Sequence, residues 1–427
     1  MLTTALVLVF VAAYAAIALE HPLKINKSAS ALLGAGLLWT IYAMATADHP
    51  RVSAELGESL MGTAQIVFFL MGAMTIVEVV DAHDGFEVIT ERIRTKTLPS
   101  LLWLVGIVTF FLSAILDNLT TTIVMVSLMR KLLARREDRL FFAGIIVIAA
   151  NAGGAWTPIG DVTTTMLWIG GQITALSIMQ AVFLPSVVSL LVPLAITAFA
   201  LRGKPVVAPA EVDRGDGVRT TASERKLMLF LGLGILVAVP VFKTLTHLPP
   251  FMGILFGLGL LWLVGDLIHR HKEDEYKERF TLAAALSRID MSSLVFFIGI
   301  LLAVATLEHT HILGGIAEWL DREVGRLDVI ILLIGLVSAV VDNVPLVAAA
   351  MGMYDMAVYP ADHFIWEFLA YCAGTGGSIL IIGSAAGVAA MGLEKIDFFW
   401  YVRKISGLAL VGYLAGAAVY LLERLAG

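Results

Sequence analysis

The sequence consists largely of apolar runs that are as long as a membrane is thick. Residues 98–116, LPSLLWLVGIVTFFLSAIL, carry no charged side chain, and similar runs recur along the 427 residues. A helix needs about 20 such residues to cross about 30 Å of hydrocarbon. Hydrophobic residues make up 59% of the chain, a share at which a soluble protein would precipitate. Since runs of alternating hydrophobicity, typical of a membrane barrel, are absent, the pattern predicts an all-α polytopic membrane protein.

Ten segments have the length and hydropathy of membrane crossings, and two others do not. The expected crossings are 2–19, 28–47, 60–80, 140–168, 180–201, 226–243, 250–267, 291–309, 364–392 and 405–423. Residues 98–133 and 328–358 are too long for one crossing, so each is expected to form a re-entrant hairpin. The first crossing resembles a signal peptide but lacks a basic n-region, and we interpret it as a retained helix.

Lysine and arginine residues are divided unevenly between the two sides of this arrangement. One side receives 24 of them, and the other receives only Arg51, Lys243, Arg322, Arg326 and Arg424. The side rich in basic residues is cytoplasmic in membrane proteins. The first hairpin is therefore expected to open to the cytoplasm and the second to the outside. Both termini are expected outside, for a multi-pass protein of the inner (plasma) membrane.

Two matching motifs indicate an internal repeat. SAILDN at 113–118 recurs as SAVVDN at 338–343, and a Gly-Gly pair at 153–154 recurs at 376–377. Each half has the order three spans, hairpin, glycine-broken span and final span. An odd number of crossings per half inverts the second copy, which predicts two inverted repeats. We place the first repeat at 1–202, a polar cytoplasmic linker at 203–225 and the second repeat at 226–427.

Glycine and proline interrupt two of the predicted crossings. The segments are NAGGAWTPIGDVTTTMLW at 151–168 and AGTGGSILIIGSAAG at 373–387. Backbone that is not helical at membrane depth is tolerated only inside protein or beside a water-filled cavity, and its free carbonyls can coordinate a small ion. The glycines alone could serve close helix packing. The asparagine, proline, aspartate and threonines of the first segment favour an ion site.

Asp117 and Asp342 stand in otherwise apolar sequence, each followed by an asparagine. An aspartate can cap the second helix of a hairpin, but Asn, Ser or Thr would do so without a charge that costs about 2.5–3.5 kcal/mol at the membrane centre. Carboxylates suit hard cations. In a poorly hydrated pocket a carboxylate can also be protonated near physiological pH. Occupation by a cation or by a proton excludes the other, which is the physical basis of cation/proton exchange.

The hairpin and broken-span motifs together resemble those of NhaD-type sodium/proton antiporters, members of the ion transporter superfamily. The resemblance runs from about residue 60 to 395 and includes MGAMTIVEVVDAHDGF at 71–86. It implies sodium or lithium export driven by inward proton movement, favoured at alkaline pH. The residues it implies for the ion site or pathway are Asp117, Asn118, Asn151, Asp161, Thr163, Thr164, Ser338, Asp342, Asn343 and Ser378. Those expected to hold Na⁺ are Asp117, Asn118, Asp161, Asp342 and Asn343.

Two residues near the end of the third span have weaker claims to a role. Glu78 is a candidate for the proton pathway, and His83 for pH sensing, the alternative for His83 being a solvated loop residue. We expect no cofactor beyond the transported Na⁺ or Li⁺ and H⁺. The expected partners are the lipid bilayer and these ions, with no nucleic acid, and a homodimer is allowed.

Other functions compete with sodium/proton exchange. Arsenite efflux and sodium-coupled organic anion transport occur on the same fold, but dicarboxylate transporters of the superfamily carry a Ser-Asn-Thr signature where this chain has Asp-Asn. An intramembrane aspartyl protease also needs two aspartates, yet the Gly-x-Gly-Asp pattern is absent. We expect a secondary transporter and not an enzyme. Whether there is one ion site or two stays open at this stage.

Overall fold

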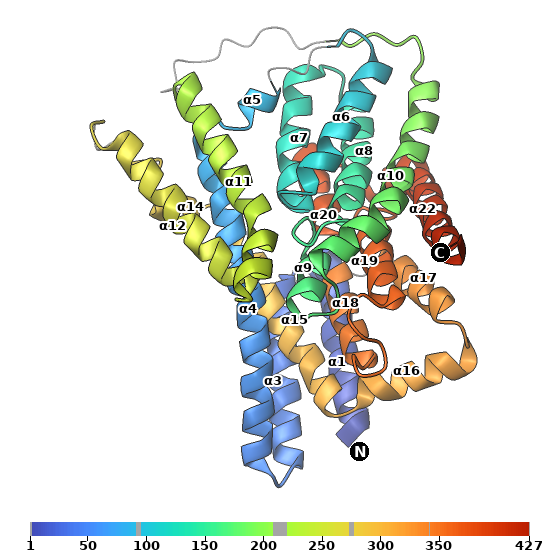
Figure 1. Ribbon diagram of the computed structural model, residues 1–427. Coiled ribbons are helices and arrows are strands. Elements are labelled where there is room, and N and C mark those ends of the chain that lie inside the picture. The colour runs from blue at the N-terminus through green and yellow to red at the C-terminus, as the bar shows by residue number, and fades with distance from the viewer. Residues whose placement is uncertain (1, 91–94, 208–219, 273–276, 341, 427) are drawn as a thin grey trace.

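The computed structural model describes residues 2–90, 95–207, 220–272, 277–340 and 342–426, and these are almost entirely helical (Figure 1). Within them, seven segments are long and apolar enough to cross a membrane. They are α3 (Lys27–Ala45), α4 (His49–Ala82), α10 (Ala175–Ala200), α11 (Ala222–Thr246), α12 (Pro250–His269), α15 (Met291–His309) and Phe398–Leu425, which joins α21 (Phe398–Tyr401), a π-helical turn and α22 (Gly407–Ala426). The predicted all-α membrane fold is confirmed.

The remaining helices complete the architecture. They are α1 (Leu2–Ala18), α2 (Glu20–Leu23), α5 (Glu87–Thr90), α6 (Leu98–Ser113), α7 (Asn118–Leu132), α8 (Arg136–Gly154), α9 (Val162–Ile169), α14 (Leu282–Leu286), α16 (Ile312–Glu323), α17 (Leu327–Val337), α18 (Asn343–Met353), α19 (Phe364–Gly376) and α20 (Ala385–Glu394). The predicted hairpin segments thus hold the helix pairs α6–α7 and α17–α18. The two predicted broken spans are helices interrupted at 155–161 and 377–384.

Several predicted boundaries differ from the structure. The final span, expected from residue 405, begins at Phe398, and the span expected from residue 180 begins at Ala175. The third span was expected at 60–80, but α4 begins at His49, where Asp48 accepts a hydrogen bond from the Arg51 amide and Arg51 pairs with Glu55 one turn later. Such caps and pairs favour helix in a polar stretch. Helix α11 begins at Ala222, inside the predicted linker 203–225, because Thr221 and Glu224 form a capping box. The second hairpin ends at Met353, before residue 358. Linker residues 208–219 lie outside the described residues.

Glycines bring the broken spans into contact with the hairpins in the same way in both halves. A Cβ atom on Gly153 would lie 2.1 Å from the carbonyl oxygen of Phe110 in α6, and one on Gly376 would lie 2.1 Å from that of Gly335 in α17. No side chain fits at such distances from backbone, so glycine is required at both positions.

The serine at each hairpin tip makes a second matched contact. Ser113 donates a hydrogen bond to the carbonyl of Ala150 at 2.6 Å, and Ser338 donates one to the carbonyl of Ala373 at 3.0 Å. The matched contacts are those expected of a structural repeat. The opposite orientation of the two halves in the membrane, and the exact limits of the repeats, stay predictions.

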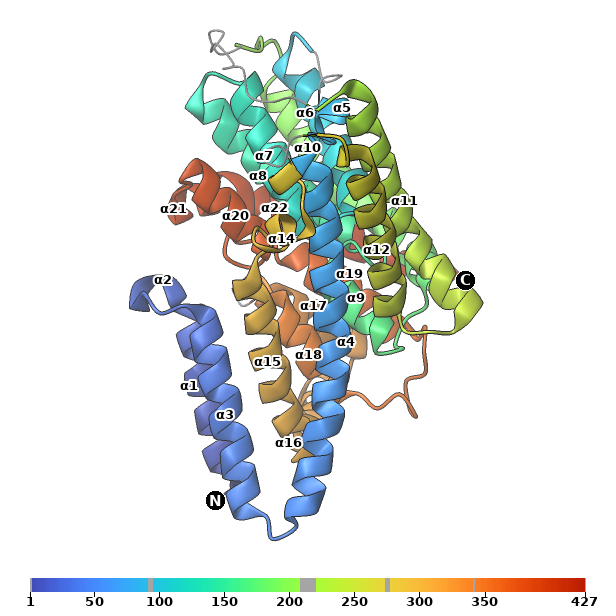
Figure 2. The ribbon, with the colours of Figure 1, turned by 90° about the vertical axis from the view of Figure 1, so that its left-hand side faces the viewer.

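The helices form two groups. In the flanking group, α3 packs against α1 and α15, and α4 packs against α11, α12 and α15; the hairpin group comprises α6–α10, α17–α20 and α22. The groups meet chiefly where α15 contacts α18 and α4 contacts α9. Hairpin α6–α7 lies in the upper part of the molecule and hairpin α17–α18 in the lower part (Figures 1 and 2). The flanking helices α11 and α12 likewise lie beside the upper part of α4, and α1 and α3 lie at the level of its lower part.

Candidate ion site at the hairpin tips

Four helices of the hairpin group, α7, α9, α18 and α20, begin at a hairpin tip or just after a break, and each begins with a capping side chain. Asp117 caps α7, Asp161 caps α9, Asp342 caps α18 and Ser384 caps α20. Each side chain accepts a hydrogen bond from a backbone amide of the first turn, which is the local reason for these residue types. The positive end of a helix dipole also stabilises a carboxylate. Ser384 caps without charge, however, so capping alone does not account for three aspartates.

The first half gathers three predicted site residues into one buried cluster. The Asn118 side-chain amide donates to the Asp161 carboxylate at 2.5 Å and to the Asn151 amide oxygen at 3.1 Å. All three side chains are buried, with at most 4% of the residue surface exposed. They come from the hairpin, the break and α8. The arrangement thus joins the hairpin tip to the broken span.

The Asp161 carboxylate accepts three hydrogen bonds in this cluster. One of its oxygens accepts from the Thr163 amide at 2.9 Å and from the Thr163 hydroxyl at 2.8 Å, while the other accepts from Asn118. Thr164 donates its hydroxyl to the Asp161 carbonyl at 2.9 Å. Both predicted threonines therefore contact Asp161. Their hydroxyls orient its carboxylate and backbone toward the hairpin.

Asp117 lies at the same hairpin tip but has fewer partners. It is half-buried and accepts hydrogen bonds from the amide and the hydroxyl of Thr120, both at 2.7 Å. Among the described residues, no ion pair includes Asp117. Thr121 and Thr122, on the next turn of α7, are fully buried and their hydroxyls have no hydrogen-bond partner within the described parts of the chain.

These two threonines are candidate oxygen ligands that the sequence-based assignment of the site left out. The signal was present as the run of three threonines directly after Asp117-Asn118. A buried hydroxyl without a partner is costly, and such groups occur where a ligand or water completes the hydrogen bonding.

The second half is arranged differently. Asn343 is buried with its amide nitrogen unpaired among the described residues, and Ser378 uses its hydroxyl on the Thr375 carbonyl at 2.7 Å. Asp342 forms an ion pair with Lys27 at 3.0 Å. The predicted residues of this half therefore lie at matching positions, but no described hydrogen bond joins their side chains into a cluster like that of Asp161.

One hydrogen bond connects the two halves at their broken spans. Asn151 donates to the Ser384 hydroxyl at 3.0 Å and to the Val147 carbonyl at 2.9 Å. Ser384 occupies in the second half the place that Asp161 occupies in the first. The two breaks thus share one polar centre, and the chain of contacts from Asn118 ends on a backbone carbonyl.

Glu78 and His83 lie elsewhere. His83 is buried at the end of α4, where its ring nitrogens contact the Val79 carbonyl at 2.6 Å and His269 at 2.9 Å. Glu78 is half-buried on α4. No described hydrogen bond or ion pair joins either residue to the hairpin tips. The alternative of a solvated loop histidine is excluded, since His83 has no exposed surface.

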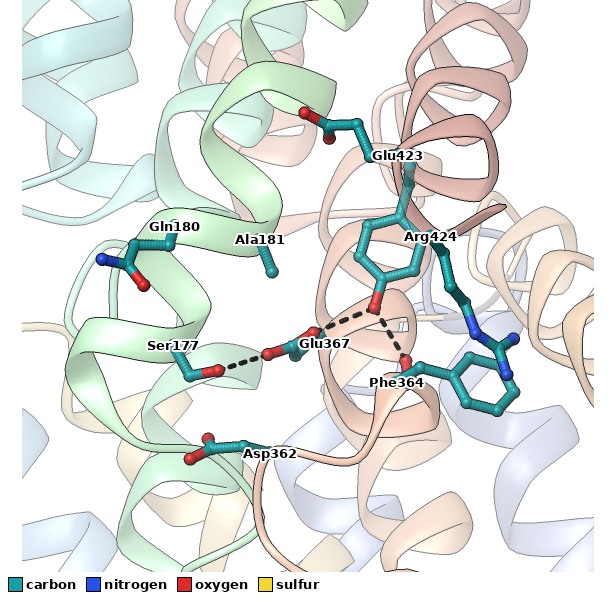
Figure 3. Close-up of a pocket in the computed structure, with 9 residues that line it drawn as sticks. Ser177, Gln180, Ala181, Asp362, Phe364, Glu367, Glu423 and Arg424 are labelled. Carbon is teal, nitrogen blue, oxygen red and sulfur yellow. Dashed lines mark hydrogen bonds between the residues drawn. The ribbon is translucent and has the colours of Figure 1, made fainter. Parts of the chain in front are cut away.

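A separate polar pocket of about 440 Å³ lies where α10 and α19 begin and α22 ends (Figure 3). At its base, Glu367 accepts hydrogen bonds from the Ser177 hydroxyl at 2.5 Å and the Tyr420 hydroxyl at 3.0 Å. Arg424 lies over the Phe364 ring, 3.4 Å from its centre. None of the predicted site residues lines this pocket, so it is distinct from the hairpin tips.

The hairpin tips present oxygen atoms as possible ligands. Carboxylates, amide oxygens and threonine hydroxyls are present, together with carbonyls at the ends of α6, α8, α17 and α19, whose last turns leave such groups without helical partners. Hard cations prefer this donor set, and carboxylates can alternatively carry a proton. No cluster of three or more His, Cys, Asp or Glu suited to a resident metal occurs among the described residues. The donor set at the hairpin tips is suited to a small hard cation.

Comparison with known proteins places the chain in a family. A family model described as a citrate transporter matches residues 14–374. Sodium/proton antiporter 1 of Arabidopsis thaliana is 54% identical over 98% of this chain and 72% of its own length. The Na(+)/H(+) antiporter NhaD of Vibrio cholerae is 33% identical over 98% of this chain and 91% of its own.

A solved structure supports the fold independently. The YdaH transporter of Alcanivorax borkumensis superimposes with a TM-score of 0.58 over 88% of both chains, at 14% sequence identity. At that identity the likeness concerns the fold alone. The family match and the relatives settle the class, and the chain belongs to the NhaD-type sodium/proton antiporters of the ion transporter superfamily, which are multi-pass secondary transporters and not enzymes.

Proposed function

We propose that this protein exports sodium, or lithium, in exchange for protons, by competition of the two ions for buried carboxylates. The observation that carries the proposal is the cluster of Asp161, Asn118 and Asn151, with Asp117 and its unpaired buried threonines at the same hairpin tip. The relatives named sodium/proton antiporters support the same assignment.

The exchange follows from the chemistry of Asp117 and Asp161. Ionised carboxylates at the hairpin tip attract Na⁺, and the Asn118 side chain, which also bonds to Asn151, holds Asp161 in place for it. When a proton arrives, the carboxylate loses its charge and its affinity for the cation. Sodium taken up on the cytoplasmic side is thus released when a proton from the outer side replaces it.

Competition also sets the pH dependence. Protons outcompete sodium at low pH, so transport is favoured at alkaline pH, and more sodium should restore transport as the pH falls. A pH profile that does not respond to sodium concentration would exclude simple competition. The protein acts in the inner (plasma) membrane with both termini outside, and a homodimer is compatible with this role.

The test of the function is sodium-induced proton movement in proteoliposomes that contain the purified protein. The decisive variant is Asp117→Asn, because asparagine caps a helix about as well as aspartate while it removes the charge. We expect it to fold and to lose exchange. Exchange at the wild-type rate by folded Asp117→Asn would mean that the carboxylate is only a cap. Asp48→Asn, which changes an exposed cap at the start of α4, is the matched control and should exchange normally.

The orientation has its own test. Arg130 ends the first hairpin and Arg322 precedes the second. Single cysteines at these positions, in a chain whose one native cysteine is buried, should react with impermeant thiol reagents from opposite sides. Reaction from the same side would exclude the inverted topology.

Organic anion transport is the second candidate, because the matching family model is described as a citrate transporter. The three aspartate caps argue against it, since they add negative charge at helix N-termini that would otherwise attract a carboxylate substrate. Citrate added to the same proteoliposomes should neither be taken up nor alter sodium-dependent proton movement.

A further inference from the structure

Lys27 reaches across the boundary between the two helix groups to the tip of the second hairpin. Its ammonium lies 3.0 Å from the Asp342 carboxylate, and 22% and 15% of the two side chains' surfaces are exposed. Lys27 is the first residue of α3, in the flanking group, whereas Asp342 caps α18, in the hairpin group. The pair therefore joins two groups of helices at a predicted sodium ligand.

The surroundings of Lys27 hold its side chain in this direction. Its neighbours Asn26 and Ser28 both hydrogen-bond to Ser292 at the start of α15, the Ser28 hydroxyl donating to the Ser292 carbonyl at 2.7 Å. The ammonium also lies over the buried Phe296 ring, 4.5 Å from its centre, which is a favourable cation–π distance. Contacts thus hold both the backbone around Lys27 and its ammonium, and the ammonium points to Asp342.

The position of Lys27 is not explained by the stability of α3. A cation in the first turn of a helix opposes the helix dipole, and acidic residues are favoured there instead. The first half offers no equivalent, because Asp117 takes part in no ion pair among the described residues. One hairpin tip thus has a carboxylate that no described cation neutralises, and the other carries its own cation.

We propose that Lys27 is a tethered competitor for sodium at Asp342, whose ammonium occupies the carboxylate in the sodium-free state and leaves when sodium binds. This inference rests on the proposed sodium/proton exchange and adds a positioning residue to it. Asp342 then has a positive partner in both states, Lys27 without sodium and the ion with it. The negative charge of its carboxylate is therefore neutralised in the sodium-free state as well.

The competition has a consequence for the two helix groups. Because the ion pair joins α3 to α18, displacement of Lys27 by sodium removes one contact between the flanking group and the hairpin group. Sodium binding at Asp342 should therefore loosen the two groups relative to each other, and any state that separates them should bind sodium more readily.

The test is sodium binding to purified wild-type protein and to Lys27→Met, measured by calorimetry in detergent. Methionine keeps the length and the apolar stem but removes the competing charge. We expect Lys27→Met to bind sodium about fivefold or more tightly, a change in the range of ordinary couplings between sites. Lys24→Met removes the same charge at an exposed position nearby and should bind like wild type. Wild-type or weaker affinity in folded Lys27→Met would overturn the proposal.

A second variant keeps the test decisive if Lys27→Met does not fold. Lys27→Arg retains the ion pair, and its planar fork holds a carboxylate more firmly than an ammonium does. It should bind sodium more weakly than wild type, and equal or tighter binding would overturn the proposal. Failure of the proposed function gives a different result, because wild-type protein itself would then bind no sodium.

Discussion

Replacing Asp161 by asparagine offers a sharp test, because both carboxylate oxygens of Asp161 accept hydrogen bonds and an asparagine side chain has only one oxygen that can accept. One oxygen accepts both hydrogen bonds from Thr163, and the other accepts from Asn118. In Asp161→Asn, the amide oxygen can replace only one of them. The new NH₂ group then faces another donor, either Asn118 or Thr163.

The side-chain amides of Asn118 and Asn151 cannot rotate by 180° to bring an acceptor to the new NH₂ group. Asn118 donates through the same nitrogen to Asn151, and Asn151 is oriented by its own hydrogen bond to the Val147 carbonyl. One buried donor is therefore left without an acceptor, which costs about 1–3 kcal/mol. Asp117→Asn has no such conflict, because its amide oxygen can accept from the Thr120 amide while its NH₂ group donates to the Thr120 hydroxyl, which can accept.

Both substitutions remove one carboxylate charge. A difference in stability between Asp161→Asn and Asp117→Asn therefore reports the cost of the unpaired hydrogen-bond donor. The chain provides its own reporter of unfolding in Cys372, the single cysteine, which is fully buried. A thiol-reactive dye should report a lower melting midpoint for Asp161→Asn than for Asp117→Asn in sodium-free buffer. Equal midpoints, or a higher one for Asp161→Asn, would refute the hydrogen-bond chain. Sodium should raise the midpoint of wild-type protein by mass action and that of Asp161→Asn much less.

Two further predictions concern residues away from the hairpin tips. Glu394 is buried and pairs with Arg130 at 2.7 Å and Arg139 at 3.2 Å, so replacing both arginines by alanine leaves an unpaired buried carboxylate and should cost about 3–5 kcal/mol. Glu394→Gln leaves two partly exposed guanidinium groups and should cost less in the same thiol assay; the reverse order would contradict this reasoning. Burial lowers the pKa of His83, so the folded protein keeps the ring neutral while the unfolded chain takes up a proton below about pH 6.5. Stability should therefore fall as the pH drops below about 6.5, and His83→Gln should make the melting midpoint less dependent on pH, whereas an unchanged slope would mean that other groups carry the effect.

Much of this fold could be predicted from local sequence because a membrane imposes local rules. Backbone groups in hydrocarbon must be satisfied within their own helix, so run length and hydropathy suffice to locate a span such as α15, which was predicted at 291–309 and found at those limits. Caps are equally local, since Asp117 and Asp342 bond to amides two or three residues away. The start of α4 does not follow from hydropathy, because its first turns are polar and the cap at Asp48 sets where the helix begins.

The sequence by itself determined the helices, their breaks and the capping residues, and only the tertiary structure decided which side chains meet. Lys27 and Asp342 are 315 residues apart, and Asn151 and Ser384 are 233 apart. In the sequence, Lys27 is a basic residue between two predicted spans and has no evident partner. In the structure it forms an ion pair with a predicted sodium ligand. Such pairs depend on how helices rotate and pack against one another. That arrangement is set by the close approach of glycines such as Gly153 and by side-chain shape over the whole bundle, and no local pattern records it.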